Sequence, residues 1–210
     1  EFADLGKQIE GPQVRDMVQQ SDRIALGEAK RIFTNSKNVQ DRLWSSLRLS
    51  SDVLYHPSPI VEALMPLEPG PYGDAVVFPS RLEGLKRQSL VVEAMRHVKT
   101  GVRLVLVGSG PDEDALRERI EKHGLQNKVE LAGRVSDERL HGLYLEALGV
   151  YYGPFDEDYG YVTLEGFAAR RPVVTLTDAG GPLEFVTDGE TGLVTPPEPQ
   201  AIAHAFDRLF

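Results

Sequence analysis

The chain has 210 residues, of which 41% are hydrophobic and 26% are charged, and its formal net charge is −9. This composition is ordinary for a soluble globular protein that is long enough to bury a core. The acidic charge disfavours nucleic acid as a partner, and the absence of cysteine excludes disulfides and thiolate chemistry. No apolar run approaches the ~20 residues of a transmembrane helix and no signal peptide is visible, so we expect a cytoplasmic protein, with the inner membrane surface as an alternative location.

The first part of the chain combines helical patterns with short apolar runs. The expected elements are a helix over residues 14–29, a strand over 31–34, a helix capped by Asn35 or Ser36, and a strand over 52–55. Residues 57–74 are rich in proline and glycine, which is typical of a linker. We therefore predict two parts, residues 1–56 and residues 75–210, joined by this linker.

From residue 75 onward, apolar runs alternate with amphipathic stretches. The runs are nearly continuous and rich in β-branched residues, as in strands that are buried on both faces of a sheet. Alternating strands and helices predict an α/β fold with a Rossmann-like, doubly wound parallel sheet, whose ligands bind where the loops follow the strands. The predicted strands cover residues 75–78, 102–107, 129–131, 149–152 and 172–176, and two of the predicted helices cover 89–95 and 114–120.

Residues 154–165 form the most informative segment, directly after a predicted strand. Gly160 lets the backbone approach a ligand closely, and the amides around Gly160, Tyr161 and Val162 open a helix. A helix N-terminus presents unpaired N–H groups and partial positive charge to a phosphate. The segment therefore predicts a site for a phosphorylated ligand.

Two acids in the same segment are candidate ligand contacts. Glu165 lies on the predicted helix and can accept two hydroxyls, as a ribose offers, while Glu157 lies before the helix, nearer to a sugar. The competing interpretation is a solvated acidic loop followed by an ordinary helix.

Two cations follow the first strand of the predicted sheet. Arg81 and Lys86 would neutralise a diphosphate there, arginine as a fork and lysine as a point charge. The competing interpretation is a solvated basic turn that also contains Arg87. A third segment, residues 180–194, predicts only a strand-turn-helix-turn-strand unit.

Taken together, these segments resemble the C-terminal domain of the retaining GT-B glycosyltransferases of group 1, the family that contains sucrose synthases and many bacterial mannosyltransferases. The family's two acids have seven residues between them and an aromatic residue and glycine after the first, and they match Glu157, Tyr159-Gly160 and Glu165, although Gly166 stands where the family usually has alanine. Its diphosphate-binding arginine and lysine match Arg81 and Lys86, its Gly-Gly-x-x-Glu and Asp-Gly-x-Thr-Gly segments match residues 180–192, and its nucleobase loop matches Ala132 to Val135, which includes Arg134.

The resemblance implies a donor-binding domain, preceded in residues 1–56 by a short remnant of the family's first domain. The implied ligand is a nucleoside diphosphate sugar, UDP- or GDP-linked, bound without a metal or other cofactor. In the implied reaction Arg81 and Lys86 stabilise the leaving diphosphate, Glu157 orients the sugar, and Glu165 the ribose. The resemblance implies that transfer to a sugar, lipid or polysaccharide acceptor needs the rest of the first domain, so we expect the isolated chain to be inactive.

Other interpretations remain open at this point. Gly108-Ser109-Gly110, with Glu130 further on, has the layout of a nicotinamide dinucleotide fingerprint, but Glu113 replaces the third glycine. Asp156-Glu157-Asp158 has the form of a metal-binding Asp-x-Asp. A non-catalytic nucleotide-sugar-binding or regulatory module and a sugar-nucleotide epimerase are the alternative functions.

Overall fold

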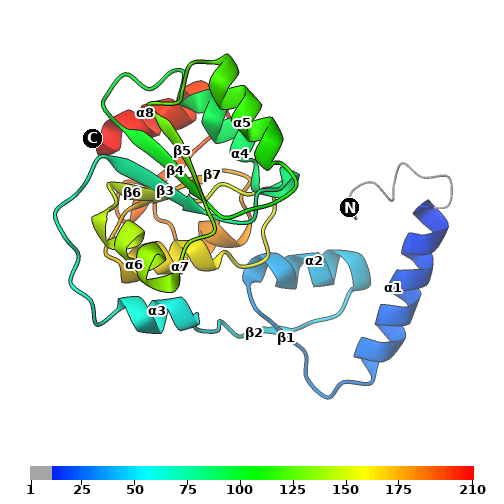
Figure 1. The fold of residues 1–210 in the computed structure, drawn as a ribbon. Coiled ribbons are helices and arrows are strands. Elements are labelled where there is room, and N and C mark those ends of the chain that lie inside the picture. Colours follow the sequence, from blue (N-terminus) through cyan, green and yellow to red (C-terminus); the bar gives the residue numbers. More distant parts are fainter. Residues whose placement is uncertain (1–10) are drawn as a thin grey trace. The chain divides into compact units, whose positions relative to one another are not determined.

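The computed structural model describes residues 11–210. The chain divides into two compact units, Glu1–His56 and Pro57–Phe210 (Figure 1). The part predicted over residues 1–56 begins with residues 1–10, which lie outside the described residues.

The first unit contains two helices and a two-stranded parallel sheet. Its elements are α1 (Gly11–Gly27), β1 (Phe33–Thr34), α2 (Lys37–Leu47) and β2 (Asp52–Val53). The residue that caps α2 is Ser36, whose Oγ accepts a hydrogen bond of 3.0 Å from the amide of Val39. This side chain satisfies one of the amides that a helix N-terminus leaves unpaired.

The second unit confirms the predicted α/β fold with a doubly wound parallel sheet. Its six strands are all parallel and follow the order β5-β4-β3-β6-β7-β8. The strands are β3 (Ala75–Pro79), β4 (Arg103–Val107), β5 (Val129–Gly133), β6 (Gly149–Tyr151), β7 (Val173–Leu176) and β8 (Gly192–Thr195). The helices are α3 (Pro59–Leu64), α4 (Gln88–Ala94), α5 (Glu113–Lys122), α6 (Asp137–Glu146), α7 (Tyr161–Ala168) and α8 (Pro199–Leu209), with single 3₁₀ turns η2 (Gly84–Lys86) and η3 (Gly181–Glu184).

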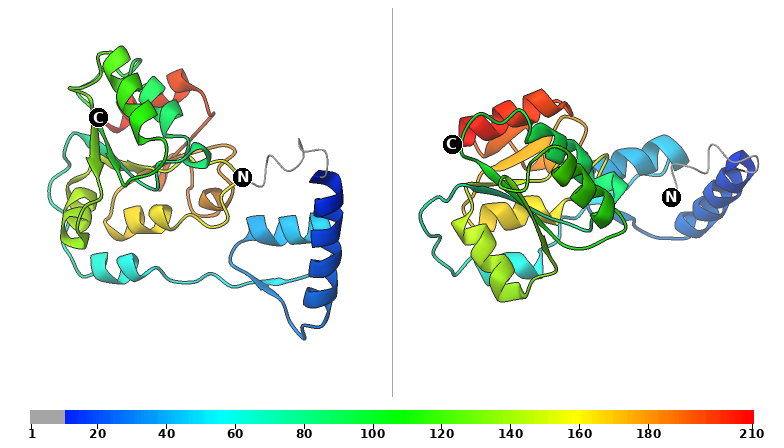
Figure 2. Two further views of the ribbon diagram at one scale, coloured as in Figure 1. Left: turned by 45° about the vertical axis from the view of Figure 1, so that its right-hand side comes forward. Right: turned by 45° about the horizontal axis from the view of Figure 1, so that its top comes forward.

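Helices cover both faces of this sheet (Figures 1 and 2). Because alternate residues of a strand point to opposite faces, Val76 and Phe78 lie in a core with side chains of α4, α5 and α8, whereas Val77 lies in a core with Leu143 of α6. Burial of both faces explains why the strands are apolar at nearly every position.

The strand order creates a switch point between β3 and β6. The chain winds outward from β3 through β4 to β5, then crosses back to β6 and winds the other way through β7 to β8. In such sheets the connections leave a crevice at the carboxyl ends of the two central strands. The loop after β3 carries Arg81 and Lys86, and the loop after β6 carries Glu157.

The structure differs from the linker predicted over residues 57–74. This segment belongs to the second unit, where residues 59–64 form α3 and pack against α7. Leu64 is fully buried and Ser58 is 3% exposed. Proline at the first turn of a helix is tolerated, because that turn has no carbonyl partner for the missing N–H, so a proline-rich segment here forms a packed helix.

The packing of α8 generates a stability prediction. Phe206 is fully buried, with its ring 5.7 Å from that of Tyr151, whereas Phe210 is 63% exposed. Phe206→Ala should lower the free energy of unfolding by about 3–5 kcal/mol, because it removes a buried ring and leaves a cavity. The matched change Phe210→Ala should stay within about 0.5 kcal/mol. Denaturant titration of both variants tests this, and equal effects would contradict the assigned core.

Candidate functional site

The two central loops meet through an ion pair. The Nζ of Lys86 donates a hydrogen bond of 2.5 Å to Oε2 of Glu157 and one of 3.3 Å to the hydroxyl of Tyr152. The side chains of Lys86 and Glu157 are 19% and 23% exposed. The solvated basic turn is therefore the wrong description of Lys86, because its charge lies half-buried against a carboxylate.

Tyr152 lies beneath the ion pair of Lys86 and Glu157. Its ring lies under the ammonium of Lys86, 5.8 Å from Nζ to the ring centroid, and it is 4% exposed. Burial raises the pKa of Tyr152 above its ordinary value, and the nearby charge of Glu157 raises it further. Tyr152 is thus a neutral hydroxyl at neutral pH, able to accept from Lys86 and to donate to an anion.

Arg81 lies on the wall of an open pocket. The pocket has a volume of about 610 Å³, and its lining includes Arg81, Arg134 and Val135 together with residues 108–110. The Arg81 side chain is 69% exposed, with Nε 3.3 Å from a carboxylate oxygen of Glu83. The structure thus brings the predicted nucleobase loop and one of the two predicted phosphate cations to the same pocket.

The turn at residues 108–110 lines the same pocket, a placement that sequence reasoning did not predict. Gly108 has φ of +133°, and a Cβ there would lie 2.1 Å from the carbonyl oxygen of Ser80. A Cβ at Gly110 would lie 2.1 Å from the carbonyl oxygen of Leu82. Both glycines therefore allow this turn to pack against the loop after β3, where it forms one wall of the pocket. The glycines themselves were the signal, which the sequence allowed to be interpreted only as a turn or a dinucleotide fingerprint.

The predicted helix N-terminus is present. Gly160 precedes α7 with φ of +89°, a left-handed conformation that favours glycine, and a Cβ there would lie 2.7 Å from Cγ of Pro182. The helix begins at Tyr161, which is 40% exposed, and Val162 follows with its side chain packed against the core. The amide of Thr163 donates to the carbonyl of Gly160 at 3.0 Å, and the N-terminal end of a helix carries partial positive charge that suits an anion.

The segment after β7 holds the acidic loop in place. The amide of Glu157 donates to the carbonyl of Ala179 at 2.9 Å, and the amide of Gly181 donates to the carbonyl of Glu157 at 2.8 Å. A Cβ at Gly181 would lie 2.7 Å from the backbone of Asp158 and Tyr159. Gly181, in a segment that by itself predicted only a strand-turn-helix-turn-strand unit, therefore supports the loop that carries Glu157.

Glu165 is not exposed on this surface. It is 5% exposed, its Oε2 accepts a 2.5 Å hydrogen bond from the hydroxyl of Tyr144, and its Oε1 accepts one of 3.3 Å from Ser58. Burial raises the pKa of Glu165 above its ordinary value, and the hydrogen bonds from Tyr144 and Ser58 offset part of this rise. Each oxygen thus accepts one hydrogen bond from within the chain, and burial keeps the carboxylate from the surface of the site.

No metal centre is evident in the described part of the chain. Among residues 11–210, no group of three or more histidine, aspartate or glutamate side chains is arranged to hold a metal ion. Asp156 and Asp158 each interact with other residues of the chain. Within the same residues, no helix is long and apolar enough to cross a membrane.

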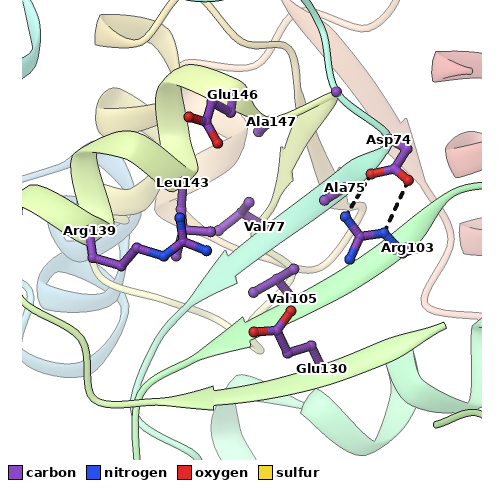
Figure 3. Close-up of a pocket in the computed structure, with 11 residues that line it drawn as sticks. Asp74, Ala75, Val77, Arg103, Val105, Glu130, Arg139, Leu143, Glu146 and Ala147 are labelled. Atoms are coloured by element: carbon purple, nitrogen blue, oxygen red, sulfur yellow. Dashed lines mark hydrogen bonds and ion pairs between the residues drawn. The ribbon is translucent and has the colours of Figure 1, made fainter. Parts of the chain in front are cut away.

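A second pocket lies away from the loops described so far. Figure 3 shows this pocket of about 200 Å³, lined by Asp74, Arg103, Glu130, Arg139 and Glu146 among others. Asp74 and Arg103 lie at the amino ends of β3 and β4 and are joined by an ion pair of 2.8 Å. No predicted site residue lines this pocket.

One family model and several known proteins match this chain in sequence. A sequence model of the family described as glycosyl transferases group 1 matches residues 73–210. Alpha-1,3/1,6-mannosyltransferase ALG2 of Dictyostelium discoideum is 34% identical over 94 residues, and exopolysaccharide phosphotransferase SCO2592 of Streptomyces coelicolor is 33% identical over 141 residues. The matches cover 45% and 65% of this chain, but only 22% and 15% of those two proteins.

A solved structure shares the fold of the chain. The crystal structure of Anabaena Alr3699/HepE in complex with UDP and glucose matches with a TM-score of 0.76 and 25% sequence identity. The match covers 90% of this chain and 57% of that chain. The chain therefore spans just over half the length of this structural neighbour.

The burial of Glu165 generates a pH prediction. Because its pKa is raised in the folded state, the folded protein holds this proton more tightly, and its free energy of unfolding falls as pH rises above the ordinary glutamate pKa. Glu165→Gln carries no charge and keeps groups that accept and donate. The free energy of unfolding of Glu165→Gln, relative to that of the wild type, should therefore increase between about pH 4 and neutral pH.

Urea denaturation across this pH range measures the difference. Glu118→Gln is the control, because Glu118 lies on an exposed face of α5. A pH dependence that is identical in wild type and Glu165→Gln would contradict the raised pKa.

Proposed function

The chain belongs to the group 1 glycosyl transferases, and from this premise we propose that it binds a nucleoside diphosphate sugar as the glycosyl donor. The observation that carries the proposal is the placement of Arg81, Lys86 and Glu157 on the two loops that flank the switch point of the sheet. Ligands of doubly wound sheets bind at this place. The neighbour that was crystallised with UDP and glucose supports the same class of ligand.

The proposed chemistry is electrostatic. As the bond from sugar to diphosphate breaks, negative charge grows on the leaving diphosphate, and fixed positive groups stabilise that charge. An ammonium has three donors, and Lys86 directs hydrogen bonds to Glu157 and Tyr152, which leaves one donor for a phosphate oxygen. Arg81 and the first amides of α7, from Tyr161, supply further positive potential.

The two acids have different proposed roles. Glu157 lies at the surface of the site and would accept hydrogen bonds from sugar hydroxyls while its charge holds Lys86 in position. In this proposal Glu165 accepts ribose hydroxyls by exchanging one internal partner. Its longer hydrogen bond, 3.3 Å from Ser58, is the one that exchanges in this proposal. The nucleobase would lie in the pocket formed by Arg134 and Val135.

We further propose that transfer retains the anomeric configuration and that it needs an acceptor domain beyond this chain. The chain spans only 22% and 15% of the first two relatives, so their activities describe larger proteins. Bringing donor and acceptor together supplies about 7–11 kcal/mol of barrier lowering in well-oriented reactions. A donor-binding domain without the acceptor side should therefore bind nucleotide without turnover, as would a non-catalytic binding module. Turnover after addition of the acceptor domain separates these two functions.

Lys86 provides the first test of the diphosphate site. Lys86→Ala should weaken binding of UDP or GDP by about 10- to 100-fold, since a hydrogen bond between charged groups contributes about 1.5–3 kcal/mol. The loss should be smaller for the monophosphate. Isothermal titration calorimetry measures both affinities. Lys122→Ala, at the exposed end of α5, is the control that changes net charge equally, and equal losses in both variants would overturn the assignment.

Donor binding should not need a divalent metal. Two phosphates carry roughly two to three negative charges near neutral pH, and Arg81, Lys86 and the α7 N-terminus offset them. Affinity should therefore survive excess chelator, and Asp158→Asn should change it by no more than a few-fold. Calorimetry with and without chelator measures this. If chelator abolishes nucleotide binding while Lys86→Ala leaves the affinity unchanged, the Asp-x-Asp metal site is favoured instead.

A further inference from the structure

Three consecutive residues at the junction of η2 and α4 each bind a different part of the sheet edge. Lys86 contacts Glu157 in the loop after β6, as described above. Gln88 is 2% exposed and donates hydrogen bonds of 2.7 Å to the hydroxyl of Ser80 and to the carbonyl of Arg81, in the loop after β3. The residue between them, Arg87, reaches the loops after β6 and β7, and neither composition nor spacing indicates that role.

The guanidinium of Arg87 joins these two loops through four hydrogen bonds. Its Nε donates to the carbonyl of Gly153 at 3.1 Å and its Nη2 to the carbonyl of Pro154 at 2.6 Å. Its Nη1 and Nη2 donate to the two carboxylate oxygens of Asp178, at 3.0 and 2.7 Å. This bidentate geometry matches the planar fork of arginine, which lysine does not provide.

The environment of Arg87 also favours a fixed conformation. Its side chain is 18% exposed, and the ring of Phe155 lies 5.6 Å from its guanidinium carbon. Its backbone has φ of +58°, in the left-handed region that disfavours residues with a Cβ. Such a conformation persists only where surrounding contacts over-determine it, and the four hydrogen bonds of the side chain supply those contacts.

These contacts bear directly on Glu157. Only two residues, Phe155 and Asp156, separate Glu157 from the carbonyl of Pro154 that Arg87 holds. Asp178 pairs with Arg87 through its side chain, while its carbonyl accepts a 3.0 Å hydrogen bond from the amide of Asp156. Arg87 therefore fixes residues 153–154, where the loop that carries Glu157 begins, and also fixes Asp178, in the segment that pairs with this loop.

We propose that Arg87 is a positioning residue for donor binding, which holds the loop of Glu157 in the register where Glu157 meets Lys86. The inference rests on the proposed function, because the donor role of Glu157 and Lys86 is part of it. A purely structural tie would stabilise the fold without affecting nucleotide affinity. The experiment therefore measures the loop and the ligand separately.

The test uses the full 210-residue chain and a matched control. Arg87→Ala removes the bidentate pair with Asp178, and Arg103→Ala removes the bidentate pair with Asp74 at the opposite end of the strands. Hydrogen exchange reports on the amides of residues 155–157, and calorimetry reports the affinity for UDP and GDP. Arg87→Ala should exchange these amides at least ~10-fold faster and bind the preferred diphosphate at least ~10-fold more weakly. Arg103→Ala should change neither quantity.

Each other outcome has a definite meaning. Unchanged exchange in Arg87→Ala, or faster exchange with unchanged affinity, overturns the positioning role. If Arg87→Ala does not fold, Asp178→Asn replaces it, because the amide keeps the shape of the partner and removes its charge, and smaller changes in the same direction are expected. If the wild-type protein binds neither nucleotide, the proposed function is overturned, and so is the role of Arg87 in donor binding. The hydrogen-exchange data still decide whether Arg87 orders the loop of Glu157.

Discussion

The arrangement of the site depends on one constraint, the reversal of winding direction between β3 and β6. Right-handed crossovers place successive helices on one face of the sheet when the chain winds one way and on the other face when it winds back. The two loops that leave the central strands therefore diverge, and neither is covered by the other's helix. This geometry brings Lys86, from the loop after β3, within 2.5 Å of Glu157, from the loop after β6, although the two lie 71 positions apart in the sequence. Without the reversal, the cations and the acid would belong to different parts of the surface.

The two acids of the motif illustrate how one sequence pattern serves two environments. Glu157 precedes α7, lies in a loop paired with the segment after β7, and keeps part of its surface in contact with solvent. Glu165 lies on the second turn of α7, where the helix packs towards α3 and α6, so its carboxylate is enclosed by Tyr144 and Ser58. Burial of a carboxylate is costly unless its oxygens are hydrogen-bonded, and the two hydroxyls meet that requirement.

The junction of η2 and α4 concentrates the contacts that hold the edge of the sheet together. Lys86, Arg87 and Gln88 direct their side chains to three loops that arise from β3, β6 and β7. The glycines at 108, 110 and 181 bring further loop segments close to these loops, because each permits a backbone approach that a Cβ would prevent.

The sequence by itself determined the fold class, the strands of the sheet and the family. Continuous β-branched runs that alternate with amphipathic stretches admit few other folds, and the spacing of Glu157 and Glu165 with Arg81 and Lys86 is specific enough to indicate group 1 glycosyl transferases. Only the tertiary structure decided which of these residues meet. It paired Lys86 with Glu157, buried Glu165, made a packed helix of the proline-rich segment at 59–64, and gave Arg87 its partners. The physical reason is that periodicity reports which face of an element is buried, whereas hydrogen bonds between loops depend on strand order and loop conformation, which no local pattern encodes.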